Sequence, residues 1–155
     1  MRQKNERNII RQKRISNPSS EKNPSEVTEV YWIFVHNNEI DYPAPTQQSG
    51  KWLVFVHKNQ IDLVWKKIKF CIENGELGRS AKVSTARPNP NAQDPEKHVI
   101  CVYTYNSDDV EDVRRIRQRL RELGITQKIP YKTDKATLEG KYAKRGHKKI
   151  SKYFE

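Results

Sequence analysis

The 155-residue chain has no long apolar run and only two cysteines. Its longest apolar stretches, such as 31–35 and 99–103, are far too short to cross a bilayer. Its polar, basic start lacks the apolar segment of a secretory signal. We therefore expect no membrane association and a cytoplasmic location. Both cysteines, Cys71 and Cys101, lie in apolar contexts, which predicts buried free thiols rather than a disulfide or metal site.

The signatures of several common enzyme classes are also missing. The four histidines fall on separate predicted elements and the two cysteines are 30 residues apart, so no metal-ligand spacing is present. The sequence contains no phosphate-binding glycine loop of the P-loop or dinucleotide type, and no Gly-x-Ser-x-Gly nucleophile elbow. We therefore expect neither a metal nor an organic cofactor.

Acidic residues are outnumbered by basic ones, and the imbalance lies at the two ends of the chain. The formal net charge is +11. Residues 1–26 hold seven Lys and Arg against three acids, and residues 127–155 hold nine against three. Residues 27–126 are nearly neutral, with fourteen against thirteen. Basic tails attract polyanions at long range, which predicts a nucleic acid partner for the tails; the alternative is that they only confer solubility.

The pattern along the chain predicts one α+β domain over 27–155 with a basic C-terminal segment, preceded by a flexible basic arm over 1–26. Runs rich in β-branched and aromatic residues predict strands at 30–35, 51–57, 81–86, 98–105 and 129–133. In the second strand, alternation places Trp52 on the opposite face from Lys51. We expect Trp52 and Trp65 to lie between helices and sheet, whereas the position of Trp32 stays open.

Two helices are predicted between these strands. The first begins after Asn59, its predicted cap, carries apolar residues three and four apart, and stops at Asn74-Gly75. The second is predicted to be capped by Ser107 or Asp108 and to end at Gly124. Its arginines are predicted to form a solvated face that matches the negative end of the helix dipole rather than a nucleic-acid surface; they are Arg114, Arg115, Arg117, Arg119 and Arg121.

A set of basic and aromatic residues is predicted to share the sheet face that the helices leave uncovered. Lysine and arginine bind phosphate through charge and hydrogen bonds, and tyrosines stack on bases or donate a hydroxyl. Lys82, between Ala81 and Val83, is the most informative, because a lysine in a strand core costs desolvation unless a partner offsets it. The alternatives are a lysine that snorkels at a strand edge and tyrosines that only pack. The candidate ligand-binding residues are Lys51, Ser84, Arg87, Tyr103, Tyr105, Lys132, Arg145 and His147, around Lys82.

Four segments resemble a known family: SGKWLVFV, AKVSTARPNPN, HVICVYTY and GITQKIPYKTD. The chain is similar, over about 31–155, to a family that includes the basophilic-leukaemia-expressed protein of animals and bacterial members named as phosphothreonine lyase domain proteins. The resemblance implies a fold similar to the eukaryotic cap-binding initiation factor, with a curved antiparallel sheet and two main helices on one face. This order of elements agrees with the pattern of strands and helices above.

The resemblance to phosphothreonine lyases implies an elimination reaction with a lysine base and a histidine acid. In that pattern a strand of Lys-x-His type precedes a helix and a strand with the catalytic lysine. Lys51 matches the first lysine and Lys82 matches the base, whereas the histidine position falls on Leu53, which cannot donate a proton. His57, further along the same face, is the candidate substitute, so the predicted catalytic residues are Lys82 and His57.

Two hypotheses therefore come from the sequence. The first is a domain that binds a phosphorylated ligand, a phosphopeptide or a nucleotide, with activity like that of a phosphothreonine lyase. The alternative is a non-catalytic nucleotide- or RNA-binding module, as the resemblance to the cap-binding factor implies. A scaffold with basic tails and no small-molecule site is a third interpretation.

Overall fold

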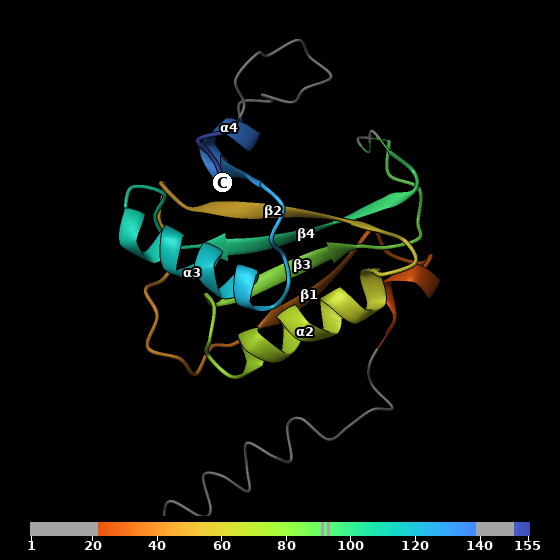
Figure 1. Ribbon diagram of the computed structural model, residues 1–155, viewed down its shortest axis with the longest axis horizontal. Coiled ribbons are helices and arrows are strands. Elements are labelled where there is room, and N and C mark those ends of the chain that lie inside the picture. The colour runs from red at the N-terminus through yellow and green to blue at the C-terminus, as the bar shows by residue number, and fades with distance from the viewer. Residues whose placement is uncertain (1–21, 91, 93, 139–150) are drawn as a thin grey trace, which may run out of the picture.

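The computed structural model describes residues 22–90, 92, 94–138 and 151–155 (Figure 1). Their centre is a curved antiparallel sheet in the order β1-β3-β4-β2-β5-β6. Strands β2 and β4 form its middle and pair over their full lengths. The strands are β1 (Trp32–His36), β2 (Gly50–His57), β3 (Ser80–Ser84), β4 (Lys97–Thr104), β5 (Pro130–Thr133) and β6 (Tyr153–Phe154). The α+β class and the antiparallel sheet predicted from the sequence are confirmed.

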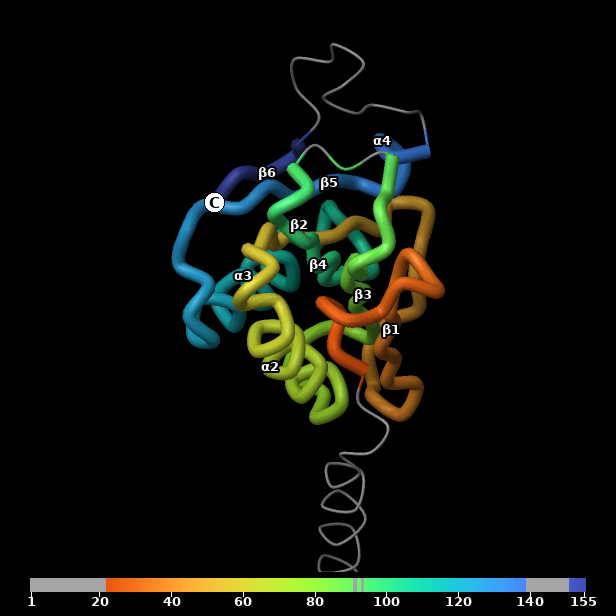
Figure 2. The backbone as a smooth tube through the Cα atoms, turned by 90° about the vertical axis from the view of Figure 1, so that its right-hand side faces the viewer, coloured from red at the N-terminus to blue at the C-terminus, as the bar shows by residue number. Residues whose placement is uncertain are grey.

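Two long helices cover one face of this sheet. Helices α2 (Ile61–Glu73) and α3 (Val110–Glu122) lie side by side on that face (Figures 1 and 2). The short helix α4 (Asp134–Leu138) follows β5 on the other side of the sheet (Figure 2). We call the face turned away from α2 and α3 the open face. Among the described residues, no helix is both long and apolar enough to span a membrane.

The core lies between the sheet and the two long helices. Alternation along β2 turns Trp52, Val54 and Val56 toward the helices, where all three are buried. The indole Nε1 of Trp52 donates to the carbonyl oxygen of Val113 in α3, at 3.0 Å. Trp65 of α2 is also buried in this layer, as predicted. Burying one large apolar side chain stabilises a fold by about 1.5–3 kcal/mol, so this layer anchors the sheet on the side of its two long helices.

The predicted helix ends are right at the C-termini and wrong at the N-termini. Gly75 and Gly124 both adopt the left-handed conformation, with φ of 73° and 98°, and so end the two helices. Helix α2 has Gln60, not Asn59, at its N-cap, without a side-chain cap bond. Helix α3 is capped by Asp109, whose carboxylate accepts from the Asp112 amide. The predicted caps Ser107 and Asp108 instead accept hydrogen bonds from Lys152 Nζ near the C-terminus.

Arg117 corrects the prediction that all the arginines of α3 are solvated, because it is fully buried. Its guanidinium donates to the main-chain oxygens of Glu155, Ile125 and Gln127, at 2.7, 2.9 and 2.7 Å. Burial lowers its pKa from the ordinary arginine value. Arg117 therefore joins α3 to the loop before β5 and to the C-terminal end of the chain.

Both ends of the described chain pack on the domain. Residues 24–26, placed by the sequence in the flexible arm, form a 3-10 helix, η2 (Pro24–Glu26). The Ser25 amide donates to Asp62 of α2 at 3.0 Å, and the Pro24 carbonyl accepts from the Ala86 amide at 3.0 Å. At the other end, the sequence pattern did not indicate strand β6, which pairs with β5. Residues 1–21 lie outside the described part.

Candidate functional site

The open face presents lysines from three strands of the sheet, β2, β3 and β5. Lys51 of β2 lies opposite Tyr103 of β4 and opposite Lys132 of β5. Lys82 of β3 lies opposite Cys101 of β4, two residues from Tyr103 on the same face. The pleat places these side chains on the open face because their neighbours Trp52, Ala81, Val102 and Tyr131 point into the core. The predicted grouping of Lys51, Lys82, Tyr103 and Lys132 is thus present in the geometry.

Lys82 is half-buried and packs on an aromatic ring. Its Nζ lies 3.9 Å from the centroid of the Trp32 ring, which places Trp32 on the open face rather than in the core. Burial lowers the pKa of Lys82, and the Lys51 charge lowers it further, while Cys101 and Asp134 act in the opposite direction. Lys82 is therefore a cation that the fold holds partly away from water.

Burial also shifts the pKa values of the neighbouring Lys132, Tyr103 and Cys101. Lys51 donates from Nζ to Asp134 Oδ1 at 3.1 Å and lies 5.6 Å from the Tyr103 ring centroid. Burial lowers the pKa of Lys132, and the Lys51 charge adds to this effect. Burial also raises the pKa of the Tyr103 hydroxyl and raises that of the Cys101 thiol to about 11. At neutral pH the centre of this face therefore holds cations beside uncharged Tyr103 and Cys101.

Exposed aromatic residues flank the lysines. Phe34 of β1 lies opposite Lys82 in the register and is 54% exposed, and Phe55 of β2 lies opposite Val99 and is 48% exposed. Flat rings on an open sheet beside cations are a common platform for nucleobases. Sequence reasoning passed over Trp32, Phe34 and Phe55 as site residues. Their alternation with core residues of the same strands, such as Val35 in β1 and Val54 and Val56 in β2, is the signal that could have identified them.

His57 does not reach the centre of the open face. It lies four residues beyond Leu53 on β2, which at strand spacing is about 13 Å. Its ring is exposed, and its Nε2 lies 3.9 Å from Glu96 Oε2. Leu53 of β2, Cys101 of β4 and Lys82 of β3 lie side by side across the sheet, with Cys101 in the middle. The predicted acid is thus apart from the predicted base.

Other predicted ligand residues have local partners. Arg87 donates to the Glu29 carbonyl at 2.8 Å and lies over the Tyr31 ring, 4.4 Å from its centroid. Tyr105 donates its hydroxyl to Asp109, the cap of α3. The Ser84 hydroxyl accepts from the Val99 amide at 2.9 Å, within the sheet. Arg145 and His147 lie outside the described residues.

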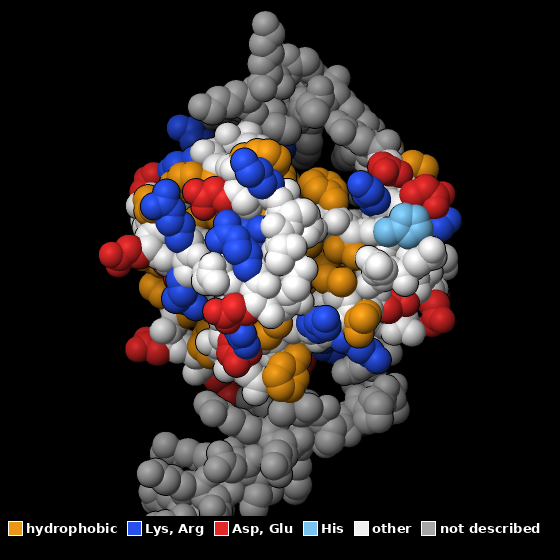
Figure 3. Space-filling model, viewed as in Figure 1, with side chains coloured by type: hydrophobic (Ala, Val, Ile, Leu, Met, Phe, Trp, Pro, Cys, Tyr) orange, Lys and Arg blue, Asp and Glu red, His pale blue; other side chains and the backbone are white. Residues whose placement is uncertain are grey.

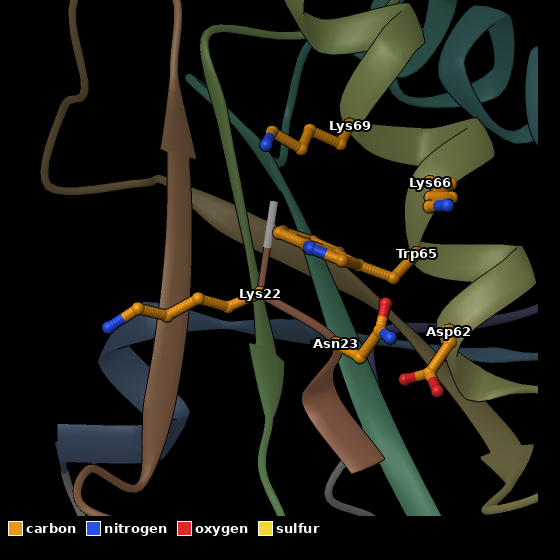
Figure 4. Close-up of a pocket in the computed structure, with 6 residues that line it drawn as sticks. All are labelled: Lys22, Asn23, Asp62, Trp65, Lys66 and Lys69. Atoms are coloured by element: carbon orange, nitrogen blue, oxygen red, sulfur yellow. The ribbon is translucent and has the colours of Figure 1, made fainter. Parts of the chain in front are cut away.

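Two hollows of the described structure lie on the helical side. Lys22, Asn23 and Lys66 line a hollow of only about 10 Å³ together with Asp62, Trp65 and Lys69 (Figure 4). A wider one of about 360 Å³ lies along α2 and α3 and contains the ion pair of Arg119 and Glu76, at 2.9 Å. On the face in Figure 3, basic and acidic side chains are interspersed. Neither hollow includes a predicted site residue.

Comparison with solved structures confirms the fold. Schistosome eIF4E complexed with m7GpppA and 4E-BP superposes with a TM-score of 0.65 at 15% identity, over 88% of this chain and 76% of that chain. The same protein with m7GpppG and 4E-BP gives 0.64 at 16% identity over the same shares. Ascaris suum eIF4E-3 with m7G cap gives 0.55 at 21% identity, over 75% and 69%. At these identities the likeness establishes the architecture alone.

The family follows from the sequence itself. The model of the family described as Basophilic leukemia-expressed protein Bles03 matches residues 46–138, which is more than half of the chain. The match runs from the approach to β2 through α4, and so includes Lys51, Lys82, Tyr103 and Lys132. The resemblance stated from the four sequence segments is therefore confirmed. This chain belongs to the Bles03 family and has the fold of the cap-binding initiation factors.

Proposed function

We propose that the open face of the sheet binds a nucleotide through its phosphate, without chemical turnover. The observation behind this proposal is Lys82, a half-buried cation that lies on the open face against Trp32. Keeping a lysine partly desolvated costs free energy, and an anionic ligand would offset that cost. Among the described residues, its ammonium group lies against the Trp32 ring and pairs with no carboxylate.

The surroundings of Lys82 favour a nucleotide over a simple anion. Lys51 and Lys132 extend the positive region on one side, while Phe34 and Trp32 offer ring faces on the other. A phosphate can bind the lysines while a base stacks on a ring. The schistosome and Ascaris proteins of the same fold were crystallised with capped nucleotides, which supports this ligand class for a shared architecture.

The same geometry argues against a lyase. β-Elimination requires a base at the α-proton and an acid at the leaving oxygen, both within hydrogen-bond reach of one substrate. Lys82 has a lowered pKa, as a base requires. The residue of β2 that lies level with it is Leu53, which cannot donate a proton, and His57 lies about 13 Å further along β2. We therefore assign Lys82 to phosphate binding and leave His57 out of the proposed site.

Isothermal titration of the full chain with nucleoside 5′-monophosphates and triphosphates tests this proposal. Replacing Lys82 with Met is expected to weaken binding at least about 10-fold, since a charge-assisted hydrogen bond is worth roughly 1.5–3 kcal/mol. Lys67→Met, on the exposed side of α2, removes the same charge far from the site and serves as the matched control. Equal affinity of wild type and the Lys82 variant would contradict the proposal.

Mass spectrometry of a phosphothreonine peptide incubated with the protein separates binding from catalysis. We expect the peptide mass to stay unchanged and no inorganic phosphate to appear. A dehydrated product that forms with the wild type and not with Lys82→Met would show instead that the site is a lyase.

A further inference from the structure

We infer that Asp134 is the internal counter-ion of the open-face site, holding Lys51 where a ligand phosphate would otherwise bind and so limiting affinity for anions. This inference rests on the proposed function, since it concerns the same lysines. The contact that supports it is the ion pair between Lys51 Nζ and Asp134 Oδ1, at 3.1 Å. Only 10% of the Lys51 side chain is exposed, against 35% of the Asp134 side chain. The carboxylate is thus the outer, more accessible member of the pair.

The backbone places Asp134 at this position independently of the ion pair. The Asp134 amide donates to the Ser49 carbonyl at 2.8 Å, which joins the end of β5 to the start of β2. The next turn is fixed by the Ala136 amide, which donates to Thr133 Oγ1 at 3.1 Å. Lys132, two residues earlier, pairs in register with Lys51. Strand β5, which carries Lys132, therefore places the Asp134 carboxylate beside Lys51.

The charge of Asp134 reaches well beyond Lys51. It acts on Lys82, raising its pKa against the effect of burial, and it raises the pKa of Tyr103 and of Cys101. A phosphate near these groups would feel the same carboxylate as a repulsive charge. Lys51, Lys82 and Lys132 attract the ligand, and Asp134 opposes them in the described part of this face. Binding must then move the carboxylate away from Lys51 or tolerate its repulsion.

Repulsion of this kind depends on the charge of the ligand. A terminal phosphate monoester carries nearly two negative charges at pH 7.5, since its second pKa is about 6, whereas a phosphodiester carries one. Removing the Asp134 charge should therefore help the monoester more than the diester. Asp134→Asn keeps an amide oxygen that can accept from Lys51 Nζ, so it changes the charge while nearly preserving the shape.

The test compares affinities of the full-length wild type and Asp134→Asn for a nucleoside 5′-monophosphate and for its methyl diester, at fixed low salt. We expect the variant to bind the monophosphate about 5–10-fold more tightly and the diester about 2–3-fold more tightly. Its melting temperature without ligand should be equal or lower, because an ion pair is lost. A purely structural role would lower stability without raising affinity.

Glu111→Gln is the control, because it makes the same change in net charge at an exposed position of α3. Unchanged or weaker monophosphate binding by Asp134→Asn, or an equal gain in the Glu111 variant, would overturn the inference. The proposed function still stands after either of these outcomes if the wild type binds the monophosphate and Lys82→Met binds it more weakly. If only Asp134→Asn binds, the counter-ion role is supported in its strongest form. If neither binds either probe, both the inference and the proposed function fail.

Discussion

At the scale of single residues, Lys82 links burial to the pH range of binding. A lysine holds phosphate only when protonated, and burial lowers the pKa of Lys82. We therefore predict that nucleotide affinity falls on the alkaline side at a lower pH than an ordinary lysine would give. Lys82→Arg should move this alkaline fall to higher pH, since a guanidinium stays charged and can also stack on Trp32. On the acid side, both proteins should weaken together as the phosphate takes up its second proton, near pH 6.

Binding constants from pH 5.5 to 10 measure this difference. Because the lysine binds phosphate in its charged form, the complex should also take up a proton at alkaline pH, which titrations in two buffers of different ionisation enthalpy would detect. Alkaline limbs of equal midpoint in wild type and Lys82→Arg would show that another group controls the pH dependence.

Arg117 is the residue whose removal should cost the most stability among the arginines of α3. Its side chain donates to three main-chain oxygens from a fully buried position. Arg117→Met keeps the apolar length of the side chain but leaves those acceptors without this donor, which we expect to cost about 2–4 kcal/mol. Urea unfolding measures the loss. Arg114→Met is the control, because Arg114 is exposed and its ion pair with Glu155, at 3.6 Å, should contribute less than about 1 kcal/mol.

At the scale of elements, α3 depends on a cap that precedes its first turn. Asp109 accepts from the Asp112 amide at 3.2 Å and also from the Tyr105 hydroxyl at the end of β4. Asp109→Ala should lower the free energy of unfolding by about 1 kcal/mol, and somewhat more if Tyr105 is left without its acceptor. Glu111→Ala removes a carboxylate from the same turn without touching the cap, and thermal unfolding should show a smaller effect. Equal losses would mean that the dipole, not the cap bond, dominates.

Local patterns predicted the elements that depend on local chemistry. The two left-handed glycines ended the helices as expected, and the alternation along β2 placed Trp52 in the core and Lys51 on the open face. Arg117 was misplaced because its residue type outweighed its spacing: it lies four residues after Val113 and three before Leu120, on the buried stripe. Spacing alone would have placed it inside.

The parts that escaped prediction depend on contacts between distant segments. Strand β6 has only two residues, and it exists because Tyr131 and Tyr153 meet across the sheet edge. In the sequence, Asp134 is one acid within a basic segment. Only the pairing of β5 with β2 brings it to Lys51, which is 83 residues away in sequence. His57 lies apart from Lys82 for a similar reason, since sharing a strand face does not mean sharing a position along it.

At the scale of the molecule, positive charge is divided between a folded site and the chain ends. On the helical side most arginines of α3 are paired, as Arg115 is with Asp112 at 3.0 Å and Arg119 with Glu76 at 2.9 Å. Residues 1–26 and 127–155 hold most of the net charge of +11. A mononucleotide would bind chiefly to the open-face lysines. A longer nucleic acid would gain further attraction from the ends, because each neutralised phosphate releases a counter-ion.

This division predicts different salt dependences for short and long ligands. Replacing Arg2, Lys4, Arg7 and Arg11 with Gln should lower the slope of log affinity against log salt for a single-stranded RNA by about 0.7 per lost phosphate contact. Mononucleotide affinity should not change, since the site residues are intact. Lys82→Met should do the reverse, weakening mononucleotide binding at least about 10-fold while most of the salt-dependent RNA binding persists. If the four glutamines weaken both ligands equally, the arm contributes to the site itself, and if they weaken neither, its charge has no role in binding nucleic acid.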